Sequence, residues 1–347
     1  RKMRKFNVAV VGATGAVGEE LFRVLEEYDF PINKLIPLAS SRSAGSKVEY
    51  KNKEITVLEL TETCFEENDI EIAFFSAGGS VSEQFAKFAV EAGAVVIDNT
   101  SHFRMDPKVP LVVPEVNPED IKLWRESGII ANPNCSTIQM VMSLKPLDEL
   151  YGIKRVDVST YQAVSGAGKT GMEELVKQMQ AFFTFKLDEA EVKAFPHQIA
   201  LNVIPQIDVA TDNGFTKEEM KMVKETQKIM HKEMQIAATC VRVPVLRSHS
   251  ESITITFGNN VDVDLDKVRE VLNNFENVEV IDDLANKKYP MPIIATDTDI
   301  TYVGRIRKDI YASNIIHYFN VADQVRVGAA TNAVRIALKW ADLENDI

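Results

Sequence analysis

The sequence contains few cysteines and no long apolar run. Its three cysteines, Cys64, Cys135 and Cys240, are far apart and odd in number. A disulfide framework is therefore not expected, and the chain is predicted to work in a reducing compartment, the cytoplasm. No pair of cysteines or histidines has the spacing of zinc ligands, so no metal site is predicted. No stretch approaches the ~18 consecutive apolar residues of a membrane span, and neither a membrane location nor a targeting segment is expected.

Basic side chains are fewer than acidic ones. The 51 acidic side chains outnumber the 39 lysines and arginines, which leaves a formal net charge of −12. A chain of this charge is not expected to bind nucleic acid in general. Small anions remain possible ligands, because single arginines and backbone N–H groups can hold them. The length of 347 residues and the 45% of hydrophobic residues allow a globular protein of two domains.

A buried strand and a glycine-rich turn stand near the start. The apolar run Asn7 to Val11 is typical of a parallel strand, and residues 19–28 are predicted to form a helix. The glycines between them have a G-x-x-G-x-x-G spacing, which differs from G-x-G-x-x-G. This context still supplies a tight turn and a helix N-terminus for a pyrophosphate, although a merely tight connection is the alternative. The predicted nucleotide contacts are Gly12, Thr14, Gly15, Ala16, Val17 and Gly18.

The end of the second predicted strand, Leu35 to Ala39, indicates which dinucleotide binds. About 20 residues after the glycines, an NAD enzyme usually has an acidic residue for the ribose 2′-OH. This chain has Ser40, Ser41, Arg42 and Ser43 there instead. An arginine flanked by hydroxyl groups suits a 2′-phosphate, so the loop favours NADP, with Ser40, Arg42 and Ser43 as contacts. The alternative is a solvated polar loop.

Apolar periodicity predicts further elements along the chain. Strands are expected at residues 70–76, 94–97, 155–161, 238–246, 252–258, 293–295, 302–305 and 318–321. Helices are expected at residues 81–91, 119–127, 171–183, 217–235 and 329–338. Strands and helices alternate up to about residue 134, whereas the strands after residue 155 suit an antiparallel or mixed sheet.

Cys135 stands at the most informative turn of the sequence. It follows Asn132, Pro133 and Asn134, and an apolar run of helical length begins at Ile138. The N-terminus of a helix stabilises a thiolate, and its N–H groups can donate to an oxyanion formed beside the sulfur. Cys135 is therefore a candidate nucleophile. The simplest alternative is a small buried hydrophobic residue.

A nucleophilic thiolate needs an acid/base partner, for which histidine is the natural choice. The five histidines are not distinguished by sequence alone. His249 lies in a Ser-His-Ser-Glu segment before an apolar strand. It is predicted to be a turn residue that is either functional or exposed to solvent. Arg242 interrupts an apolar strand pattern, so it either faces outward or binds a carboxylate with two parallel hydrogen bonds. Arg104 is a candidate anion clamp or a surface arginine paired with an acid.

Taken in order, these motifs resemble the aspartate-semialdehyde dehydrogenase family. The resemblance covers nearly the whole chain and is strongest at the cysteine turn and at residues 160–168 and 240–251. It implies a reversible, NADP- and phosphate-dependent oxidation of L-aspartate 4-semialdehyde to L-4-aspartyl phosphate. The reaction belongs to the biosynthesis of lysine, threonine, methionine and, in bacteria, diaminopimelate.

The order of the predicted elements indicates an architecture, and the resemblance implies an assembly and a set of roles. The predicted α/β fold has an N-terminal Rossmann-type NADP-binding domain, residues 1–134, and an α+β catalytic and dimerisation domain with a mixed sheet, residues 135–328. A helix within residues 329–347 is expected to pack back on the first domain, and a homodimer or homotetramer is expected. The resemblance implies that Cys135 forms the thioester, that His249 is the acid/base and that Gln162 orients the substrate. It implies that Arg242 binds the substrate carboxylate and Glu218 its amino group. The implied phosphate contacts are Arg104, Asn134 and Lys221, and the implied further cofactor contacts are Ser165, Gly166 and Gln324.

Three other functions remain open at this point. An N-acetylglutamyl-phosphate reductase combines a similar glycine turn with a cysteine and a histidine, and glyceraldehyde-phosphate dehydrogenase uses the same thioester chemistry. Asn134 directly before the cysteine and the acidic region around Glu218 favour a substrate with a free amino group. A redox sensor that binds NADP without turnover is the alternative from another class. Cys135 would be replaceable in such a sensor.

Overall fold

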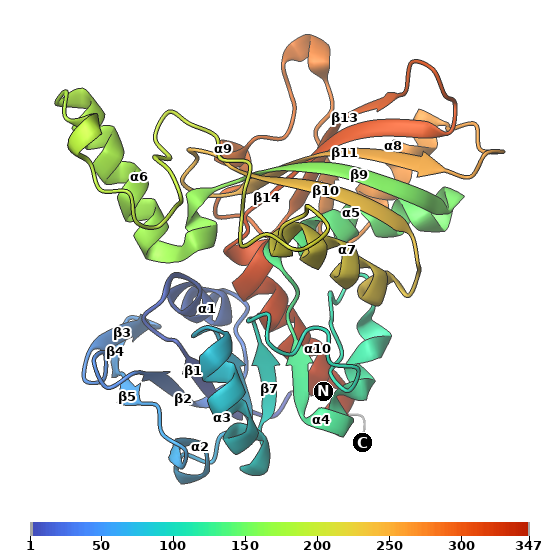
Figure 1. The fold of residues 1–347 in the computed structure, drawn as a ribbon. Helices are drawn as coiled ribbons and strands as arrows, with labels where there is room; N and C mark the ends of the chain where they lie inside the picture. The colour runs from blue at the N-terminus through green and yellow to red at the C-terminus, as the bar shows by residue number, and fades with distance from the viewer. Residues whose placement is uncertain (1–2, 346–347) are drawn as a thin grey trace. The chain divides into compact units, whose positions relative to one another are not determined.

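The computed structural model describes residues 3–345, so Arg1 and Lys2 lie outside the described residues. The chain forms two compact units (Figure 1). The first contains the residues up to Asn134 together with those from Ala329 onwards, and the second extends from Cys135 to Gly328. Within residues 3–345, no helix is long and apolar enough to cross a membrane.

The first unit is built on a six-stranded sheet in the order β5-β2-β1-β6-β7-β8, in which every pair of neighbours is parallel. Its strands are β1 (Phe6–Val11), β2 (Ile32–Ala39), β5 (Leu58–Glu59), β6 (Ile72–Phe75), β7 (Val95–Asp98) and β8 (Ile129–Ala131). Its helices are α1 (Ala16–Glu27), α2 (Cys64–Glu67), α3 (Gly79–Glu91), η1 (Pro118–Leu123), α4 (Trp124–Ser127) and α10 (Thr331–Asn345), and β3 (Lys47–Tyr50) pairs with β4 (Lys53–Thr56). The strand order reverses direction between β1 and β6, which is where open parallel sheets bind ligands.

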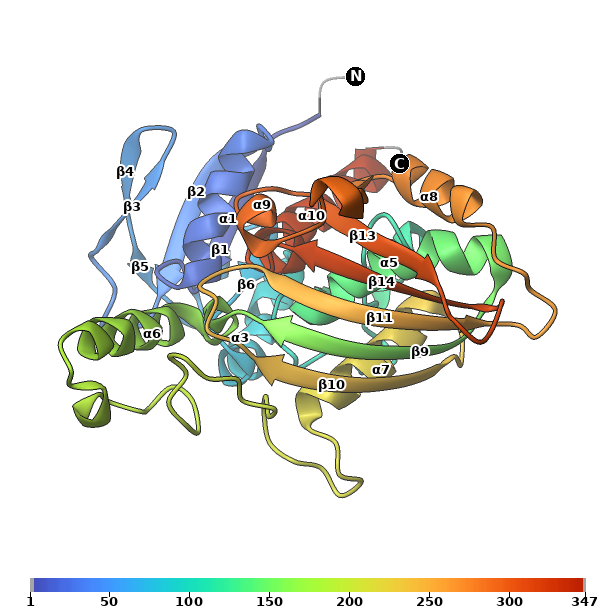
Figure 2. The ribbon, with the colours of Figure 1, turned by 90° about the horizontal axis from the view of Figure 1, so that it is seen from above.

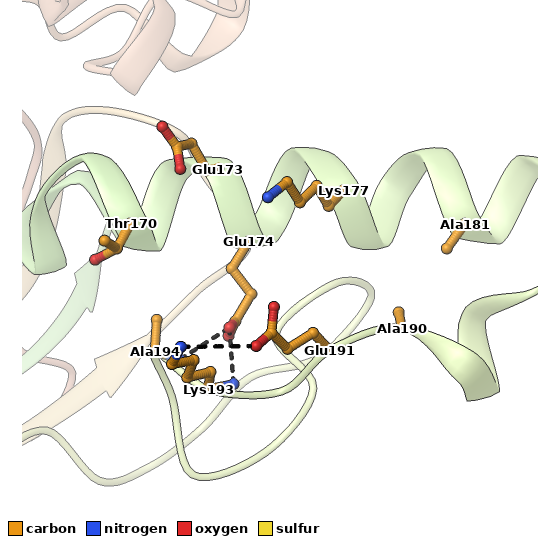
Figure 3. A pocket seen from close by; sticks show the side chains of 9 residues that line it. All are labelled: Thr170, Glu173, Glu174, Lys177, Ala181, Ala190, Glu191, Lys193 and Ala194. Atoms are coloured by element: carbon orange, nitrogen blue, oxygen red, sulfur yellow. Dashed lines mark hydrogen bonds and ion pairs between the residues drawn. The ribbon is translucent and has the colours of Figure 1, made fainter.

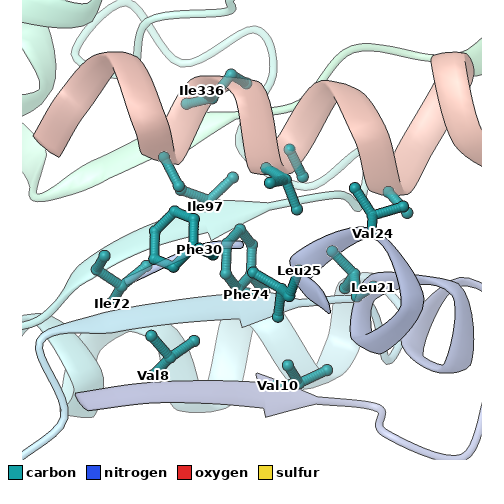
Figure 4. Packing of buried hydrophobic residues seen from close by; sticks show 14 of the residues in the cluster. Val8, Val10, Leu21, Val24, Leu25, Phe30, Ile72, Phe74, Ile97 and Ile336 are labelled. Atoms are coloured by element: carbon teal, nitrogen blue, oxygen red, sulfur yellow. The ribbon is translucent and has the colours of Figure 1, made fainter. Parts of the chain in front are cut away.

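The core of the first unit contains residues from both ends of the chain. Figure 4 shows Ile336 of α10 above Ile97 of β7, with Phe74 of β6 and Val8 of β1 in the same cluster. All four side chains are almost fully buried. The last helix therefore completes the hydrophobic core of the first unit.

The second unit is built on a mixed sheet in the order β10-β9-β11-β14-β13-β12. The β9–β10 and β12–β13 pairs are parallel, and the other three pairs are antiparallel. Its strands are β9 (Ile153–Gln162), β10 (Gln235–Arg242), β11 (His249–Phe257), β12 (Val278–Val280), β13 (Thr301–Lys308) and β14 (Ile315–Ala322). Its helices are α5 (Cys135–Tyr151), η2 (Val164–Ala167), α6 (Gly168–Phe183), η3 (Leu187–Glu189), α7 (Lys217–Met230), α8 (Leu265–Asn274), η4 (Leu284–Asn286) and α9 (Pro292–Ala295), and η5 (Arg326–Ala330) leads into α10. The predicted fold class is confirmed.

The two faces of the mixed sheet are covered differently. The long helices α5 and α7 pack on one face, the covered face, and Figure 2 looks onto the other face, where the short helix α9 packs through Ala295 against Tyr302 and Val321. Along β11 the side chains alternate: His249, Glu251 and Ile253 are fully buried, whereas Ser252 and Thr254 are only half-buried. This period of two assigns His249 and Glu251 to the covered face.

The ends of two elements were predicted wrongly. The helix expected at residues 217–235 ends before His231, whose left-handed backbone has a φ of 51°. Gln235 already begins β10, so the strand expected at residues 238–246 is displaced and ends at Arg242. A left-handed residue is a common helix end, but histidine is not the glycine that usually reveals one.

Other differences have local causes. The strand predicted at residues 293–295 is wrong, because these residues belong to helix α9, where Pro292 at the first position favours helical φ. Residues 119–127 form η1 and α4 rather than one helix. The sequence patterns did not reveal α8, which Asp264 caps by accepting from two backbone N–H groups.

Candidate active site

Cys135 is the first residue of α5, three residues earlier than the predicted helix start. Its side chain is half-buried, and it lies where the helix dipole stabilises negative charge. Gly328 packs directly against it: a Cβ atom on Gly328 would lie 2.8 Å from the Cys135 Cβ. Gly328 is thus a site residue that the sequence motifs did not reveal, because only the three-dimensional contact identifies it.

His249 was predicted in a turn and is instead the first residue of β11, where it is fully buried. The exposed alternative is therefore wrong. Its Nδ1 atom accepts a hydrogen bond of 2.9 Å from the backbone N–H of Ala163. A neutral ring in this position must carry its hydrogen on Nε2. Nε2 is buried and has no hydrogen-bond partner among the described residues, so it is available to a ligand.

The environment of His249 disfavours its cationic form. Burial lowers the pKa of His249 well below its ordinary value, and the positive charge of Arg242 lowers that pKa further. The imidazole is therefore neutral near pH 7. A neutral ring with a free Nε2–H can donate to oxygen where negative charge develops.

Arg242 is the last residue of β10 and only 8% exposed, so the outward-facing alternative is wrong. Its Nη1 atom donates to the carbonyl oxygen of Ala163 at 2.7 Å, and its guanidinium lies 5.6 Å from the ring centroid of Phe195. Burial lowers the pKa of Arg242, and the negative charges of Glu218 and Cys135 oppose this effect. The guanidinium thus remains a buried cation beside acidic groups.

Gly166 brings Arg242 and His249 to one point. A Cβ atom on Gly166 would lie 2.8 Å from Arg242 Nη1 and 3.3 Å from His249 Nε2. Next to it, Ser165 Oγ accepts a hydrogen bond from Gln324 Nε2. Gln324 Oε1 in turn accepts from the backbone N–H of Ser248 at 2.8 Å. Five of the predicted site residues therefore meet in the second unit.

Gln162 ends β9 and lies beside Arg242 in the parallel ladder. Its side chain is buried, and its Oε1 atom accepts a hydrogen bond of 2.9 Å from the hydroxyl of Thr160. The amide nitrogen therefore faces away from Thr160 and can act as a donor.

Glu218 and Lys221 lie on the first turns of α7. Both carboxylate oxygens of the adjacent Glu219 already accept hydrogen bonds. Its Oε1 accepts from the Thr216 N–H at 2.9 Å, and its Oε2 accepts from the Cys240 N–H at 2.8 Å. Glu218 is buried and lies 3.7 Å from the ammonium of Lys221. Of the two adjacent glutamates, Glu218 is the one whose negative charge raises the pKa of Arg242.

Arg104 and Asn134, the other two residues assigned to phosphate, belong to the first unit and are buried. Arg104 Nε donates to the carbonyl oxygen of Asn132 at 3.0 Å, and Nη2 donates to that of Asn99 at 3.1 Å. The surface-arginine alternative is therefore wrong. Backbone carbonyls orient this guanidinium.

A cavity of about 480 Å³ lies at the carboxyl ends of the first unit's strands and suits a dinucleotide. Gly12 has a φ of +85°, and a Cβ atom there would lie 2.7 Å from the Ser76 carbonyl oxygen. A Cβ on Gly18 would collide with the Gly12 carbonyl. Only glycine therefore allows this close packing of turn and helix. The cavity is lined by Val11, Gly12, Thr14, Gly15, Ala39, Ser40, Ser43, Leu60, Ser76, Ala77, Val81 and Phe85.

Only part of the Ser40–Ser43 loop lines this cavity. Ser40 and Ser43 line it, whereas Arg42 is exposed on the adjacent turn and is not among the lining residues. Leu60, directly after β5, and Phe85 of α3 also line it. They were not predicted, because isolated apolar residues usually belong to the core.

A second cavity, of about 490 Å³, lies between α6 and residues 190–194 of the second unit. Figure 3 shows Glu174 reaching from α6 to this loop, where its Oε1 accepts from the N–H groups of Lys193 and Ala194, each at 2.8 Å. The lining mixes acidic and basic side chains, and none of the predicted site residues is among them. Glu174 has a structural role there, since it ties the loop to the helix.

Both units match parts of one family. Residues 7–124 match "Semialdehyde dehydrogenase, NAD binding domain", and residues 144–327 match "Semialdehyde dehydrogenase, dimerisation domain". The aspartate-semialdehyde dehydrogenase of Campylobacter jejuni is 66% identical over 342 residues, which cover 99% of either chain.

Solved structures agree with this match. Aspartate semialdehyde dehydrogenase II of Vibrio cholerae, complexed with ASA, has a TM-score of 0.93 and 47% identity over 98% of this chain and 99% of that one. Aspartate semialdehyde dehydrogenase of Candida albicans, with NADP, has a TM-score of 0.75 and 27% identity over 99% of this chain and 100% of that one. The chain therefore belongs to the aspartate-semialdehyde dehydrogenase family.

Proposed function

We propose that the protein catalyses the reversible NADP- and phosphate-dependent oxidation of L-aspartate 4-semialdehyde to L-4-aspartyl phosphate through a thioester on Cys135. The observation that carries this proposal is the buried imidazole of His249, whose Nε2 lies beside Gly166 together with the Arg242 guanidinium. An acid/base group next to a carboxylate-binding group suits an amino-acid aldehyde. The names of the Campylobacter jejuni and Vibrio cholerae relatives support this substrate.

In the proposed mechanism Cys135 is the nucleophile. Its thiolate attacks the aldehyde carbon, a C–S bond forms, and the carbonyl electron pair moves to oxygen. His249 is the acid/base group, and its Nε2–H donates to that oxygen as negative charge develops. The chemistry that bound NADP supplies is acceptance of the hydride from the same carbon. A phosphate oxygen then attacks the thioester carbon, the C–S bond breaks, and Cys135 leaves as a thiolate.

Substrate binding is assigned to polar groups of both units. Arg242 is proposed to bind the α-carboxylate with two parallel hydrogen bonds, Glu218 to bind the amino group, and Gln162 to orient the carbonyl. Phosphate is assigned to Arg104, Asn134 and Lys221. Since Lys221 lies 3.2 Å from Asp208 and 3.7 Å from Glu218, phosphate there competes with two ion pairs.

NADP rather than NAD is the proposed cofactor. Ser40 and Ser43 line the cavity of the first unit, and Arg42 lies between them in sequence without an acidic neighbour. An arginine and hydroxyl groups suit the 2′-phosphate, and the Candida albicans relative is described with NADP. The glycine turn from Gly12 to Gly18 is proposed to hold the pyrophosphate, and Ser165, Gly166 and Gln324 are proposed as further cofactor contacts.

We further propose a homodimer, or a homotetramer built from dimers, that works in the cytoplasm. The match to a dimerisation domain supports this assembly, and the sheet face seen in Figure 2 is the surface on which we expect it. The reaction would serve the biosynthesis of lysine, threonine and methionine, and of diaminopimelate in bacteria.

The test is NADP reduction by the purified protein with L-aspartate 4-semialdehyde, with and without phosphate. N-acetylglutamate semialdehyde is the parallel substrate, and Cys135→Ser is the control variant. We expect phosphate-dependent turnover of the first aldehyde alone, and a loss of at least about 1,000-fold in Cys135→Ser with NADP binding retained.

Other results would replace the proposal. Preference for the N-acetylated substrate would point to N-acetylglutamyl-phosphate reductase chemistry. NADP binding without turnover of either aldehyde would support the redox sensor. Undiminished turnover in Cys135→Ser would exclude the thioester.

A further inference from the structure

Glu251 is a buried carboxyl group that the mechanism above does not use. It lies two residues after His249 on the covered face of β11, and its side chain is fully buried. Neither carboxyl oxygen has a hydrogen-bond partner among the described residues. A charged carboxylate without partners is very costly to bury. Burial accordingly raises the pKa of Glu251 well above its ordinary value, so the group is an uncharged acid with one O–H donor.

The titratable groups around Glu251 do not supply a counter-charge. Cys240 of β10 and Tyr318 of β14 interact with it electrostatically, and burial raises the pKa of both. Both are therefore uncharged near pH 7. The O–H of Glu251 needs an acceptor that is neutral and equally buried.

Gln139 of α5 has such an acceptor. Its Nε2 donates to the carbonyl oxygen of His249 at 3.0 Å and to Asn320 Oδ1 at 3.1 Å, which identifies the other end of the amide as the oxygen. That oxygen, Oε1, is buried and has no hydrogen-bond partner among the described residues. Both hydrogen bonds of Gln139 end on residues near Glu251. His249 lies two residues before Glu251 on β11, and Asn320 of β14 is paired with Glu251 in the ladder.

We propose that Glu251 is a positioning residue of the active site: as an uncharged acid it donates to Gln139 Oε1 and thereby locks α5 to β11. A hydrogen bond between them would satisfy both of these buried groups. Gln139 lies one helical turn after Cys135, and its amide holds the backbone of His249. The bond thus controls the distance between the nucleophile and the acid/base group. This inference rests on the proposed function for its kinetic part only.

The chemistry of the pair predicts opposite effects on stability and activity. Replacing both partners of a buried hydrogen bond by apolar residues can be neutral or stabilising, whereas replacing one leaves the other unsatisfied. Gln139→Leu also removes the bonds to His249 and Asn320, so the matched comparison is between Gln139→Leu alone and Gln139→Leu with Glu251→Leu. The double variant should unfold at a higher temperature than Gln139→Leu, because it no longer buries an unsatisfied carboxyl group, while its kcat stays about 10-fold below wild type. Glu251→Gln retains a donor and should keep kcat within about 3-fold.

A purely structural role would give another pattern. In that case the kcat of each variant would follow its unfolding temperature, and the double leucine variant would be more active than Gln139→Leu alone. Full activity in the double variant, or a Glu251→Gln variant as slow as Glu251→Leu, would overturn the proposal. Turnover of L-aspartate 4-semialdehyde by the wild type, measured in the same assay, tests the proposed function separately.

An infrared measurement tests the bond itself without turnover. At neutral pH the difference spectrum between wild type and Glu251→Gln should show the C=O band of a protonated carboxyl group. Gln139→Leu should shift this band, because it removes the acceptor. Thr160→Val, on the strand beside Glu251, should not shift it, and the exposed Glu279→Gln should give no such band. Absence of the band, or a band that Gln139→Leu leaves in place, would refute the proposal.

Discussion

The ring of His249 is held by one backbone donor, the N–H of Ala163, and lies beside one cation, Arg242. Protonation of Nδ1 would place two N–H groups against each other, and protonation of either nitrogen would add charge next to the guanidinium. The residue therefore stays neutral at a pH where an exposed histidine is partly charged.

The titration of His249 gives the first prediction. In 15N-histidine NMR spectra, His249 should remain the neutral Nε2–H tautomer at pH 6.5, the ordinary pKa of histidine. Arg242→Gln removes a charge that lowers this pKa, so the titration midpoint should rise. Arg307→Gln, which removes a cation that does not act on His249, should leave the midpoint unchanged. An equal shift in both variants would contradict the assignment.

The same pKa has a consequence for stability. Because the pKa of His249 is lower in the folded than in the unfolded chain, the unfolded chain binds the proton first as the pH falls. The contribution of His249 to the free energy of unfolding is therefore complete above about pH 6.5 and decreases as the pH falls below that value.

Arg42 carries the second prediction. If its guanidinium binds the 2′-phosphate, Arg42→Ala should raise the KM for NADP by about 10-fold or more and change the KM for NAD little, because NAD lacks this phosphate. Steady-state kinetics with both cofactors provide the measurement. Lys53→Ala, an exposed cation of the β3–β4 hairpin, is the matched control. Equal increases for NADP and NAD would remove Arg42 from the cofactor site.

At the scale of elements, the packing of Gly328 against the start of α5 fixes the position of Cys135. A Cβ atom at residue 328 would lie 2.8 Å from the Cys135 Cβ and 3.1 Å from its Cα. Real Cβ atoms do not approach so closely, so the first turn of α5 would have to move. A shift of this size at a reacting atom costs about 100-fold in rate.

Gly328→Ala should therefore lower kcat about 100-fold and leave NADP affinity unchanged, as measured by turnover and cofactor titration. Gly258→Ala is the control, since a Cβ there meets nothing within 4 Å. Neither glycine has a positive φ, so backbone strain cannot explain a difference. Full activity of Gly328→Ala would show that α5 can move without loss of function.

Elements were predictable where the pattern was local. The apolar β1 and the glycine turn identified the parallel sheet, and the lone Cys135 before an apolar run identified the helix that carries it. His249 was misread as a turn residue because its segment Ser-His-Ser-Glu is polar, and polar segments usually lie on the surface. Its burial depends on α5 and on the neighbouring strands, which no local pattern contains.

At the scale of the whole molecule, the first unit needs both ends of the chain. Residues 135–328 are inserted between the parallel sheet and α10, whose Ile336 and Trp340 lie in the core of the first unit. The last helix was predicted to return to the first domain, although the apolar face of a helix does not by itself specify which sheet it covers.

Ile336→Ala gives the corresponding prediction. The side chain is fully buried, so its removal should lower the free energy of unfolding by about 2–5 kcal/mol, as measured with urea. Leu123→Ala, a 57% exposed residue of the same unit, should change it by less than about 0.5 kcal/mol. Similar effects of the two substitutions would indicate that α10 does not contribute to the core.

The alternation along β11 has a consequence for how this family tolerates substitution. A saturation scan of the strand should separate three kinds of selective pressure within nine residues. Losses at residues 249 and 251 should track turnover, those at residues 253, 255 and 257 should track protein abundance, and those at residues 252, 254 and 256 should track subunit association. The position of a substitution along this one strand would thus indicate whether it affects catalysis, folding or assembly.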